Sequence, residues 1–238
     1  MPYQFFDCTV VDVIDESDLV KRYFIRYPDE IPFSFKAGQF VMLDLPIQSK
    51  VTNRSYSIAS APTHDHTIEL AIVIKPGGIG TPFIFENIER NSIVKCTKAL
   101  GKFGLPEIIE DDLCFVCTGT GIAPLRSMTL DIYNRNIPHK NIYLVFGNRW
   151  TKDILYRKEM EALATIHPEF KFIPVLSRDN PEWKGRKGYV HLVYEELFAD
   201  KRPPLFYICG WPDMIKEARQ RIEAMGYDKK RIKFELYD

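Results

Sequence analysis

The sequence has no excess of charge of either sign. Its 238 residues include 32 Lys and Arg and 32 Asp and Glu, so the formal net charge is zero with neutral histidines. Binding to nucleic acid or to an anionic membrane surface by charge alone needs clustered, uncompensated cations. The overall charge therefore favours neither kind of partner, and only a local basic patch stays compatible with one.

Long apolar runs and a secretory signal are missing as well. No segment of this sequence approaches the ~18–20 uninterrupted apolar residues that a membrane-spanning helix needs. The segment from Met1 to Asp7 lacks the basic stretch followed by an apolar stretch that begins a signal peptide. We therefore expect no membrane span and a cytoplasmic protein.

Cysteine is scarce, and its five positions are Cys8, Cys96, Cys114, Cys117 and Cys209. An odd, scattered set in a cytoplasmic chain disfavours disulfides. Cys114 and Cys117 form a C-x-x-C, which would suit a redox or metal site. However, the apolar run 113–117 is typical of a buried strand, on which positions three apart point to opposite faces. We interpret the pair as structural, expect no metal site, and find no C-x4-C-x2-C run for an iron–sulfur cluster.

Residues 1–105 have the pattern of an antiparallel β-barrel or sandwich. Short apolar or alternating runs are separated by Gly, Pro, Asn and Asp, as in small all-β domains. The expected strands are 6–14, 23–27, 39–45, 56–59, 67–74 and 92–97. A short helix, 81–87, follows a Gly-rich turn, with Pro82 expected at its first position.

Residues 106–238 alternate between strand-like and helix-like runs. The expected strands are 113–117, 141–146, 170–176, 205–209 and 231–237, and the expected helices are 123–134, 156–164, 190–198 and 213–225. Such alternation with short connections predicts a doubly wound parallel sheet covered on both faces. The sequence thus predicts two domains, 1–105 and 106–238.

A glycine turn follows the first strand of the second domain. Gly119, Thr120 and Gly121 lead into a helix, with Pro124 in its first turn. Such a turn lets backbone N–H groups approach a pyrophosphate at a helix N-terminus. The third glycine of G-x-G-x-x-G is replaced by Pro124, and no acidic residue follows the second strand where one is expected ~20 residues on. An ordinary Rossmann dehydrogenase is therefore disfavoured, and a purely structural turn stays an alternative.

Two further features of the first domain suit an anionic, planar ligand. Arg54 could bind a phosphate bidentately, and Tyr56 would share its face of a strand and offer a ring for stacking. Ser57 adds a hydroxyl donor. The Gly-rich segment 75–81 leads into a helix and is another candidate anion site. Each could equally be structural, as an exposed arginine on a strand or a glycine hairpin.

In order and spacing, these motifs resemble those of the ferredoxin–NADP reductase superfamily over nearly the whole chain. The family's R-x-Y-S corresponds to Arg54, Ser55, Tyr56 and Ser57, and its G-x-x-[ST] to Gly78, Ile79, Gly80 and Thr81. Its G-T-G-x-A-P corresponds to Gly119 through Pro124, and its C-G-x-x-x-M to Cys209, Gly210 and Met214. Asp153 and Tyr156 are similar to the D-x-x-Y of its second nucleotide-domain helix.

The resemblance implies a role for each motif. FAD would bind the barrel, with its pyrophosphate on Arg54 and the Gly78–Gly80–Thr81 turn, its ring on Tyr56 and its N5 near Ser57. A nicotinamide nucleotide would bind at 119–124, with Cys209 beside the nicotinamide. At the C-terminus, Glu235 would relay protons and Tyr237 would cover the flavin, although Asp238 extends beyond the usual aromatic ending. A plain terminal strand is the structural alternative.

The choice between NADPH and NADH depends on the segment after the third strand of the second domain. Ser177 and Arg178 there resemble relatives that bind the 2′-phosphate of NADPH. A guanidinium suits that dianion, whereas an acidic residue suits the ribose diol of NADH. Asp179 is adjacent, and basic residues follow at Lys184 and Arg186. We expect NADPH, with NADH as the alternative and a solvated basic loop as the structural one.

The predicted function is hydride transfer from NAD(P)H to bound FAD and electron transfer to a separate acceptor. Ser57, Cys209 and Glu235 are the predicted catalytic residues. The acceptor would be a ferredoxin, a flavodoxin or an oxygenase component. Three alternatives remain: a reductase of free flavin or quinone, an electron-transfer subunit of a multicomponent oxygenase without independent activity, and a binding module that retains the fold without the chemistry.

Overall fold

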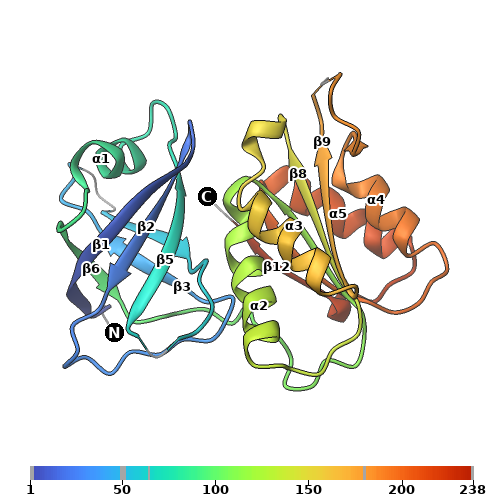
Figure 1. Cartoon of the computed structure of the whole chain (residues 1–238), viewed down its shortest axis with the longest axis horizontal. Coiled ribbons are helices and arrows are strands. Elements are labelled where there is room, and N and C mark those ends of the chain that lie inside the picture. Colours follow the sequence, from blue (N-terminus) through green and yellow to red (C-terminus); the bar gives the residue numbers. More distant parts are fainter. Residues whose placement is uncertain (1–2, 49–51, 64, 179–180, 237–238) are drawn as a thin grey trace. The chain divides into compact units, whose positions relative to one another are not determined.

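The computed structural model describes residues 3–48, 52–63, 65–178 and 181–236 (Figure 1). The chain forms two compact units. The first consists of Met1–Leu105 together with Arg126–Arg135, and the second of Pro106–Leu125 together with Asn136–Asp238.

The first unit is built on a six-stranded antiparallel sheet in the order β4-β3-β6-β1-β2-β5. Its strands are β1 Phe5–Ser17, β2 Val20–Arg26, β3 Phe40–Asp44, β4 Asn53–Ser57, β5 Thr67–Val73 and β6 Ile93–Thr97. An isolated bridge between Ile58 and Leu70 joins the two ends of this order, so the sheet closes on itself as a barrel.

Side chains at alternate positions of the strands fill the interior of this barrel. β2 buries Val20, Tyr23 and Ile25, because successive side chains of a strand point to opposite faces. Helix α1, Gly80–Asn87, packs on the same core through Ile84, as does Ile88 directly after it. The strands and the helix predicted for this half are confirmed among the described residues, and β4 lies earlier than expected.

The prediction that Pro82 occupies the first position of α1 is wrong. The helix begins at Gly80, and Pro82 is its third residue. The first four N–H groups of a helix have no intrahelical acceptor. A proline at the third position therefore removes no helical hydrogen bond.

The second unit is built on a six-stranded parallel sheet in the order β10-β9-β8-β7-β11-β12. Its strands are β7 Leu113–Thr118, β8 Ile142–Asn148, β9 Phe170–Leu176, β10 Arg186–Lys187, β11 Leu205–Gly210 and β12 Ile232–Leu236. The predicted doubly wound fold is confirmed. The central strand β7 is buried over its first five residues, as expected for a parallel strand covered on both faces.

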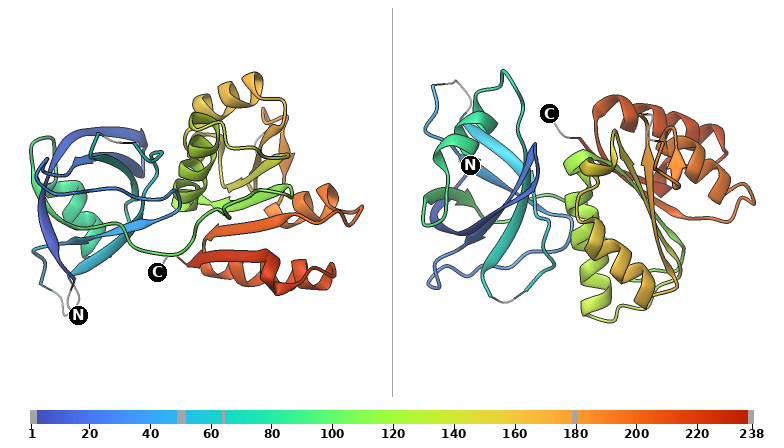
Figure 2. Two further views of the ribbon diagram at one scale, coloured as in Figure 1. Left: turned by 90° about the horizontal axis from the view of Figure 1, so that it is seen from below. Right: turned by 45° about the horizontal axis from the view of Figure 1, so that its top comes forward.

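Helices cover the two faces of this sheet (Figure 2, left). Helix α3, Arg157–Ile166, packs against β9 on one face. Helices α4, Val190–Leu197, and α5, Pro212–Ala224, share a core cluster with Cys114, Val116 and Ile208 on the other. Helix α2, Ile122–Asn134, begins in the second unit and continues in the first.

Local differences from the sequence prediction concern α3 and β10. The helix was expected to begin at Tyr156, but Tyr156 is its N-cap, with φ +54° and a carbonyl that accepts from Met160 N at 3.0 Å. Strand β10 was not predicted, because Arg186 and Lys187 are both exposed and form no apolar run. They pair with Val175 and Leu176 at the end of β9.

Candidate functional site

The second unit has a topological switch point between β7 and β11. From β7 the chain builds outward through β8 and β9 to β10, and it then returns to the other side of β7 with β11 and β12. Loops that follow the two central strands therefore diverge at the carboxyl edge of the sheet. In open parallel sheets this is where ligands bind.

The predicted nucleotide-binding turn lies at this switch point. Gly119, Thr120 and Gly121 form a 3-10 turn directly after β7. A Cβ added at Gly121 would collide with the carbonyl oxygen of Cys209 and lie 2.6 Å from its carbonyl carbon, so only glycine allows this turn to pack on β11. Pro124 is buried as the third residue of α2, in its first turn as predicted.

Cys209 and Glu235 are neighbours in the sheet of the second unit. They are register partners on β11 and β12, so their side chains lie on the same face. Cys209 is fully buried and Glu235 is half-buried. The backbone N–H of Trp211 donates to Thr118 Oγ1 at 3.2 Å, which ties the turn after β11 to the end of β7. Met214, in α5, packs against the core on the other face.

Thr118 was not among the predicted site residues. Its hydroxyl joins two loops that are far apart in sequence. The sequence feature that could have indicated this role was a threonine at the end of a strand, directly before a glycine turn.

Ser177 and Arg178 extend the carboxyl edge at β9, where their N–H groups donate to Asn148 O at 2.9 Å and Arg149 O at 3.2 Å. Both side chains are exposed.

The basic residues further along this loop differ in their environment. Arg186 forms a bidentate pair with Glu196, at 2.7 and 2.8 Å, so its guanidinium is already occupied. Lys184 is exposed. Asp179 lies outside the described residues, as do Tyr237 and Asp238 at the C-terminus.

In the first unit, β4 carries the Arg54, Tyr56 and Ser57 motif. Arg54 and Tyr56 lie on one face of the strand, and Ser57 lies on the other, where it is buried. A Cβ added at Gly80 would lie 2.9 Å from Arg54 Nε. The guanidinium therefore runs along the first turn of α1 at close range, and the absence of a side chain at Gly80 leaves room for it.

The Gly-rich lead into α1 is internally hydrogen-bonded. Gly78 N donates to Lys75 O at 2.9 Å, and Lys75 N donates to Thr81 Oγ1 at 2.8 Å. A hydroxyl that accepts one hydrogen bond keeps its own O–H as a donor. The first turn of α1 thus combines helical N–H groups, the Thr81 hydroxyl and the Arg54 cation, which together suit an anion.

Tyr56 gives an independent sign of a ligand. Its hydroxyl is buried and has no hydrogen-bond partner within the part of the chain that the structure describes. Desolvation, which exceeds the opposing effect of Arg54, raises the pKa of this phenol, so it stays protonated and able to donate. Buried hydroxyl groups are normally paired, and a ligand that accepts from Tyr56 would complete the site.

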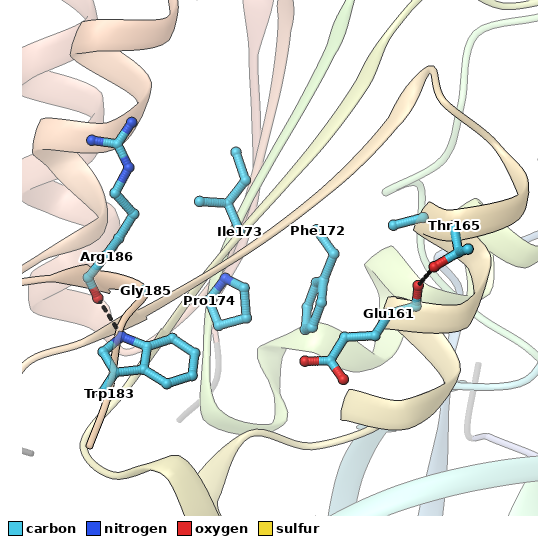
Figure 3. Close-up of a pocket in the computed structure, with 9 residues that line it drawn as sticks. Glu161, Thr165, Phe172, Ile173, Pro174, Trp183, Gly185 and Arg186 are labelled. Carbon is cyan, nitrogen blue, oxygen red and sulfur yellow. Dashed lines mark hydrogen bonds between the residues drawn. The ribbon is translucent and has the colours of Figure 1, made fainter.

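A separate cavity of about 410 Å³ lies beside β9 in the second unit (Figure 3). Trp183 forms one wall, where its indole N–H donates to Arg186 O at 2.9 Å, and Phe172 and Pro174 lie opposite. None of the predicted site residues lines this cavity.

Two family models match this chain, one in each half of the sequence. A family model described as "Oxidoreductase FAD-binding domain" matches residues 7–104, and one described as "Oxidoreductase NAD-binding domain" matches residues 115–220. Ferredoxin–NADP reductase B of Sorangium cellulosum is 34% identical over 241 residues, which cover 98% of this chain and 98% of that protein. The chain belongs to the ferredoxin–NADP reductase family. The resemblance inferred from the motifs is thereby confirmed.

Some relatives are longer than this chain, whereas others have about the same length. The phenol 2-monooxygenase reductase component DmpP of Pseudomonas sp. CF600 is 30% identical over 91% of the chain, which spans only 61% of that protein. Cytochrome P450 reductase GcoB of Amycolatopsis superimposes with a TM-score of 0.88 at 28% identity, covering 99% of this chain and 70% of that one. A ferredoxin–NADP+ reductase structure from Neisseria gonorrhoeae, at 24% identity and a TM-score of 0.82, covers 99% of both chains and shares the fold.

As a member of the ferredoxin–NADP reductase family, the chain is an FAD- and NAD(P)-binding oxidoreductase that passes electrons to a separate acceptor. The residues present fit both groups. Arg54 beside the first turn of α1 and the buried Tyr56 hydroxyl suit FAD, and the tightly packed turn at Gly121 suits a nucleotide pyrophosphate. No helix among the described residues is both long and apolar enough to cross a membrane.

Proposed function

We propose that the chain is an NADPH-dependent reductase whose flavin site lies in residues 1–105 and whose nucleotide site lies in residues 106–238. The observation that carries this proposal is the packing of the Gly121 turn against Cys209 at the switch point of the parallel sheet. That packing leaves the N-terminus of α2 with its backbone N–H groups at the carboxyl edge, where a pyrophosphate binds in folds of this kind.

The residues predicted to bind the flavin have proposed tasks. Bound FAD supplies the exchange of two electrons with a nicotinamide and of single electrons with an acceptor. Arg54, with Gly78, Gly80 and Thr81, neutralises the flavin pyrophosphate. Tyr56 presents its ring to the flavin and donates from its hydroxyl, and Ser57 donates near the reacting edge.

The residues of the second unit bind and orient the nicotinamide nucleotide. Gly119, Thr120 and Gly121 hold its pyrophosphate, Gly210 keeps space beside the nicotinamide, and Cys209 and Glu235 contact the reacting region. As register partners, the thiol and the carboxylate can be oriented by one another, and the carboxylate can hold a proton. Pro124 fixes the first turn of α2, and Met214 supports the turn after β11. The stacking role of Tyr237 stays a prediction.

NADPH is the proposed donor because Arg178 follows the end of β9 with an exposed guanidinium. Charge reversal by Arg178→Asp should weaken NADPH binding by at least about tenfold, the scale of a charge-assisted hydrogen bond. NADH binding should change by no more than about threefold. The matched control is Lys171→Asp, an equal charge reversal near the start of β9, the strand that Arg178 follows. Equal losses for NADPH and NADH would argue against a phosphate contact.

The deciding experiment is anaerobic stopped-flow reduction of the FAD-loaded protein by NADPH and by NADH at equal concentration. Bleaching of the visible absorbance of the oxidised flavin reports the reaction. We expect NADPH to reduce the flavin faster. A flavin that neither nucleotide bleaches rules out the proposed function, and a clear advantage for NADH rules out the role of Arg178 alone.

The proposed acceptor is a ferredoxin or flavodoxin, which the similarity to a ferredoxin–NADP reductase over 98% of the chain supports. A second candidate is the reductase part of a multicomponent oxygenase, since several relatives are named as such components. Reduction of an added ferredoxin or flavodoxin by NADPH favours the first. Activity that appears only with an oxygenase component favours the second. The cytoplasmic location stays a prediction.

A further inference from the structure

The barrel of the first unit has a seam between its end strands, β4 and β5. Ile58 and Leu70 form an isolated bridge there, and Ala59 N donates to Glu69 O at 2.7 Å. The other neighbouring strands of the barrel pair over at least two register positions, from two between β3 and β6 to seven between β2 and β5. The seam is therefore the place where the backbone contributes least to closure.

Side chains from α2 cross this seam. Within the first unit, Arg126 NH1 donates to Ala59 O at 2.7 Å and to a carboxylate oxygen of Glu69 at 3.1 Å. Ser127 Oγ donates to Ser60 O at 2.6 Å, and Ser60 Oγ accepts from Glu69 N at 3.1 Å. Arg126 is 5% exposed and Ser127 is fully buried, so water competes little for these bonds.

Glu69 holds the network together from the barrel side. Its side chain is 4% exposed, and its second oxygen accepts from Arg22 Nε at 2.6 Å. Arg22 also pairs with Glu16 at 3.4 Å, so the cluster contains two carboxylates and two guanidinium groups. A buried carboxylate is strongly unfavourable once one of its partners is removed. Arg126 is thus an integral part of the seam and not an accessory surface charge.

The seam adjoins both cofactor motifs along the chain. Ala59 follows Ser57, the last residue of β4, by two positions, and Arg126 follows Pro124 by the same number. The helix that begins with the nucleotide-binding turn therefore supplies the side chain that fixes the end of the flavin-binding strand. Displacement of Ala59 would alter the direction in which β4 presents Tyr56 and Ser57.

We propose that Arg126 is a positioning residue for flavin binding, acting through Ala59 and Glu69 on strand β4. This inference rests on the proposed function, because it takes β4 as the flavin strand. Arg126 itself touches the backbone and a carboxylate, and its effect on the flavin is indirect. It makes the flavin site dependent on residues beyond 105.

The test compares Arg126→Met with Arg135→Met. Arg135 lies on the same segment of the first unit, but its side chain is 66% exposed and pairs with Asp131 in the i,i+4 position of the same helix. Far-ultraviolet circular dichroism first shows whether each protein is folded. For the folded proteins we then measure the FAD dissociation constant and the visible circular dichroism of the bound flavin. Loss of the charged hydrogen bonds in Arg126→Met should weaken FAD binding by about tenfold or more. It should also change the flavin dichroism.

Arg135→Met should leave the dissociation constant within about twofold. Arg126→Lys keeps the charge and one donor group, and it should recover part of the lost affinity. A lower free energy of unfolding in Arg126→Met, with unchanged FAD affinity and dichroism, overturns the proposal, since that is the result of a merely structural ion pair.

A second variant keeps the test decisive if Arg126→Met does not fold. Ser127→Ala removes one seam hydrogen bond and no charge, and we expect FAD binding weaker by about threefold, together with altered flavin dichroism. Unchanged values in that variant overturn the proposal. A wild-type protein that binds no FAD contradicts the proposed function itself, whereas normal binding in wild type and in both seam variants contradicts only the role of Arg126.

Discussion

At the scale of single residues, the nucleotide-binding turn depends on a missing side chain. The turn at Gly121 packs so closely on β11 that a methyl group would meet the Cys209 backbone, which cannot move aside as a flexible side chain could. Gly121→Ala should therefore lower the free energy of unfolding by about 1–3 kcal/mol, the usual cost of overpacking. It should also weaken NADPH binding.

Urea unfolding of the apo-protein and calorimetric titration with NADPH measure the two effects. The control is Gly104→Ala, where the added Cβ would have an ordinary contact of 3.7 Å with Ala37 O. If Gly121→Ala and Gly104→Ala bind NADPH equally well, the close approach at Gly121 does not serve the nucleotide.

The environment of the two C-x-x-C thiols, Cys114 and Cys117, determines whether they can react. Cys114 and Cys117 are both fully buried on β7, and burial raises the pKa of each thiol. The thiolate is the form that attacks disulfides and binds metals. These two cysteines are therefore packing residues, as the alternation of the strand indicated. Cys209, by contrast, lies at the carboxyl edge, beside Glu235.

At the scale of elements, helices α4 and α5 share a buried titratable group. His191 is 5% exposed, with Nδ1 at 2.9 Å from the Tyr194 hydroxyl and Nε2 at 3.3 Å from Glu217. Burial is the largest influence and lowers the pKa of His191, against the attraction of Glu217 and Glu195 and together with the repulsion of Arg221.

This histidine should make the stability of the protein depend on pH. Because the folded state binds the proton less readily than the unfolded state, the free energy of unfolding should fall as pH decreases below about 6.5, the ordinary value for histidine. His191→Gln should reduce that slope, as measured by urea unfolding between about pH 5 and pH 8. His167→Gln removes a more exposed histidine and is the control. An unchanged slope in His191→Gln would assign the effect to other groups.

Much of the element order could be predicted from the sequence, because it rests on local patterns. Apolar runs gave β7 and β9, and periodicity gave α2 and α5, since burial and helix geometry act over a few residues. Strand β10 could not be predicted, because its two exposed residues pair only with the end of β9. Tyr156 likewise has a left-handed backbone with a buried side chain, and no Gly, Asn or Asp at that position indicates such a conformation in the sequence.

In the candidate site, too, motifs of contiguous residues could be predicted, whereas contacts between residues far apart in sequence could not. The glycine turn at 119–121 and the β4 motif are contiguous in sequence, and their chemistry is recognisable from residue types. The pairing of Glu69 with Arg126 joins residues 57 positions apart. No spacing rule connects them, because their partnership arises only when the barrel seam and α2 have formed.

At the scale of the whole molecule, α2 is divided between the two units. Its residues 126–134 belong to the first unit, although the helix begins in the second. A ligand that binds one unit stabilises that unit by an amount that grows with the logarithm of the ligand concentration, about 2.7 kcal/mol at 100 times the dissociation constant. Protection of backbone amides from exchange on ligand binding can therefore show with which unit each segment is stabilised.

Hydrogen exchange measured by mass spectrometry should show this division. FAD added to the apo-protein should slow exchange in β1 to β6 and, to a similar degree, in residues 126–134, because Arg126 and Ser127 hold that segment to the barrel. Adenosine 2′,5′-bisphosphate should slow exchange mainly in β7 to β12. Arg126→Met should uncouple residues 126–134 from the FAD effect, while Arg135→Met should not. If FAD protects the strands of the barrel but leaves 126–134 unchanged in the wild-type protein, the helix belongs energetically to the second unit, and the flavin site is complete without it.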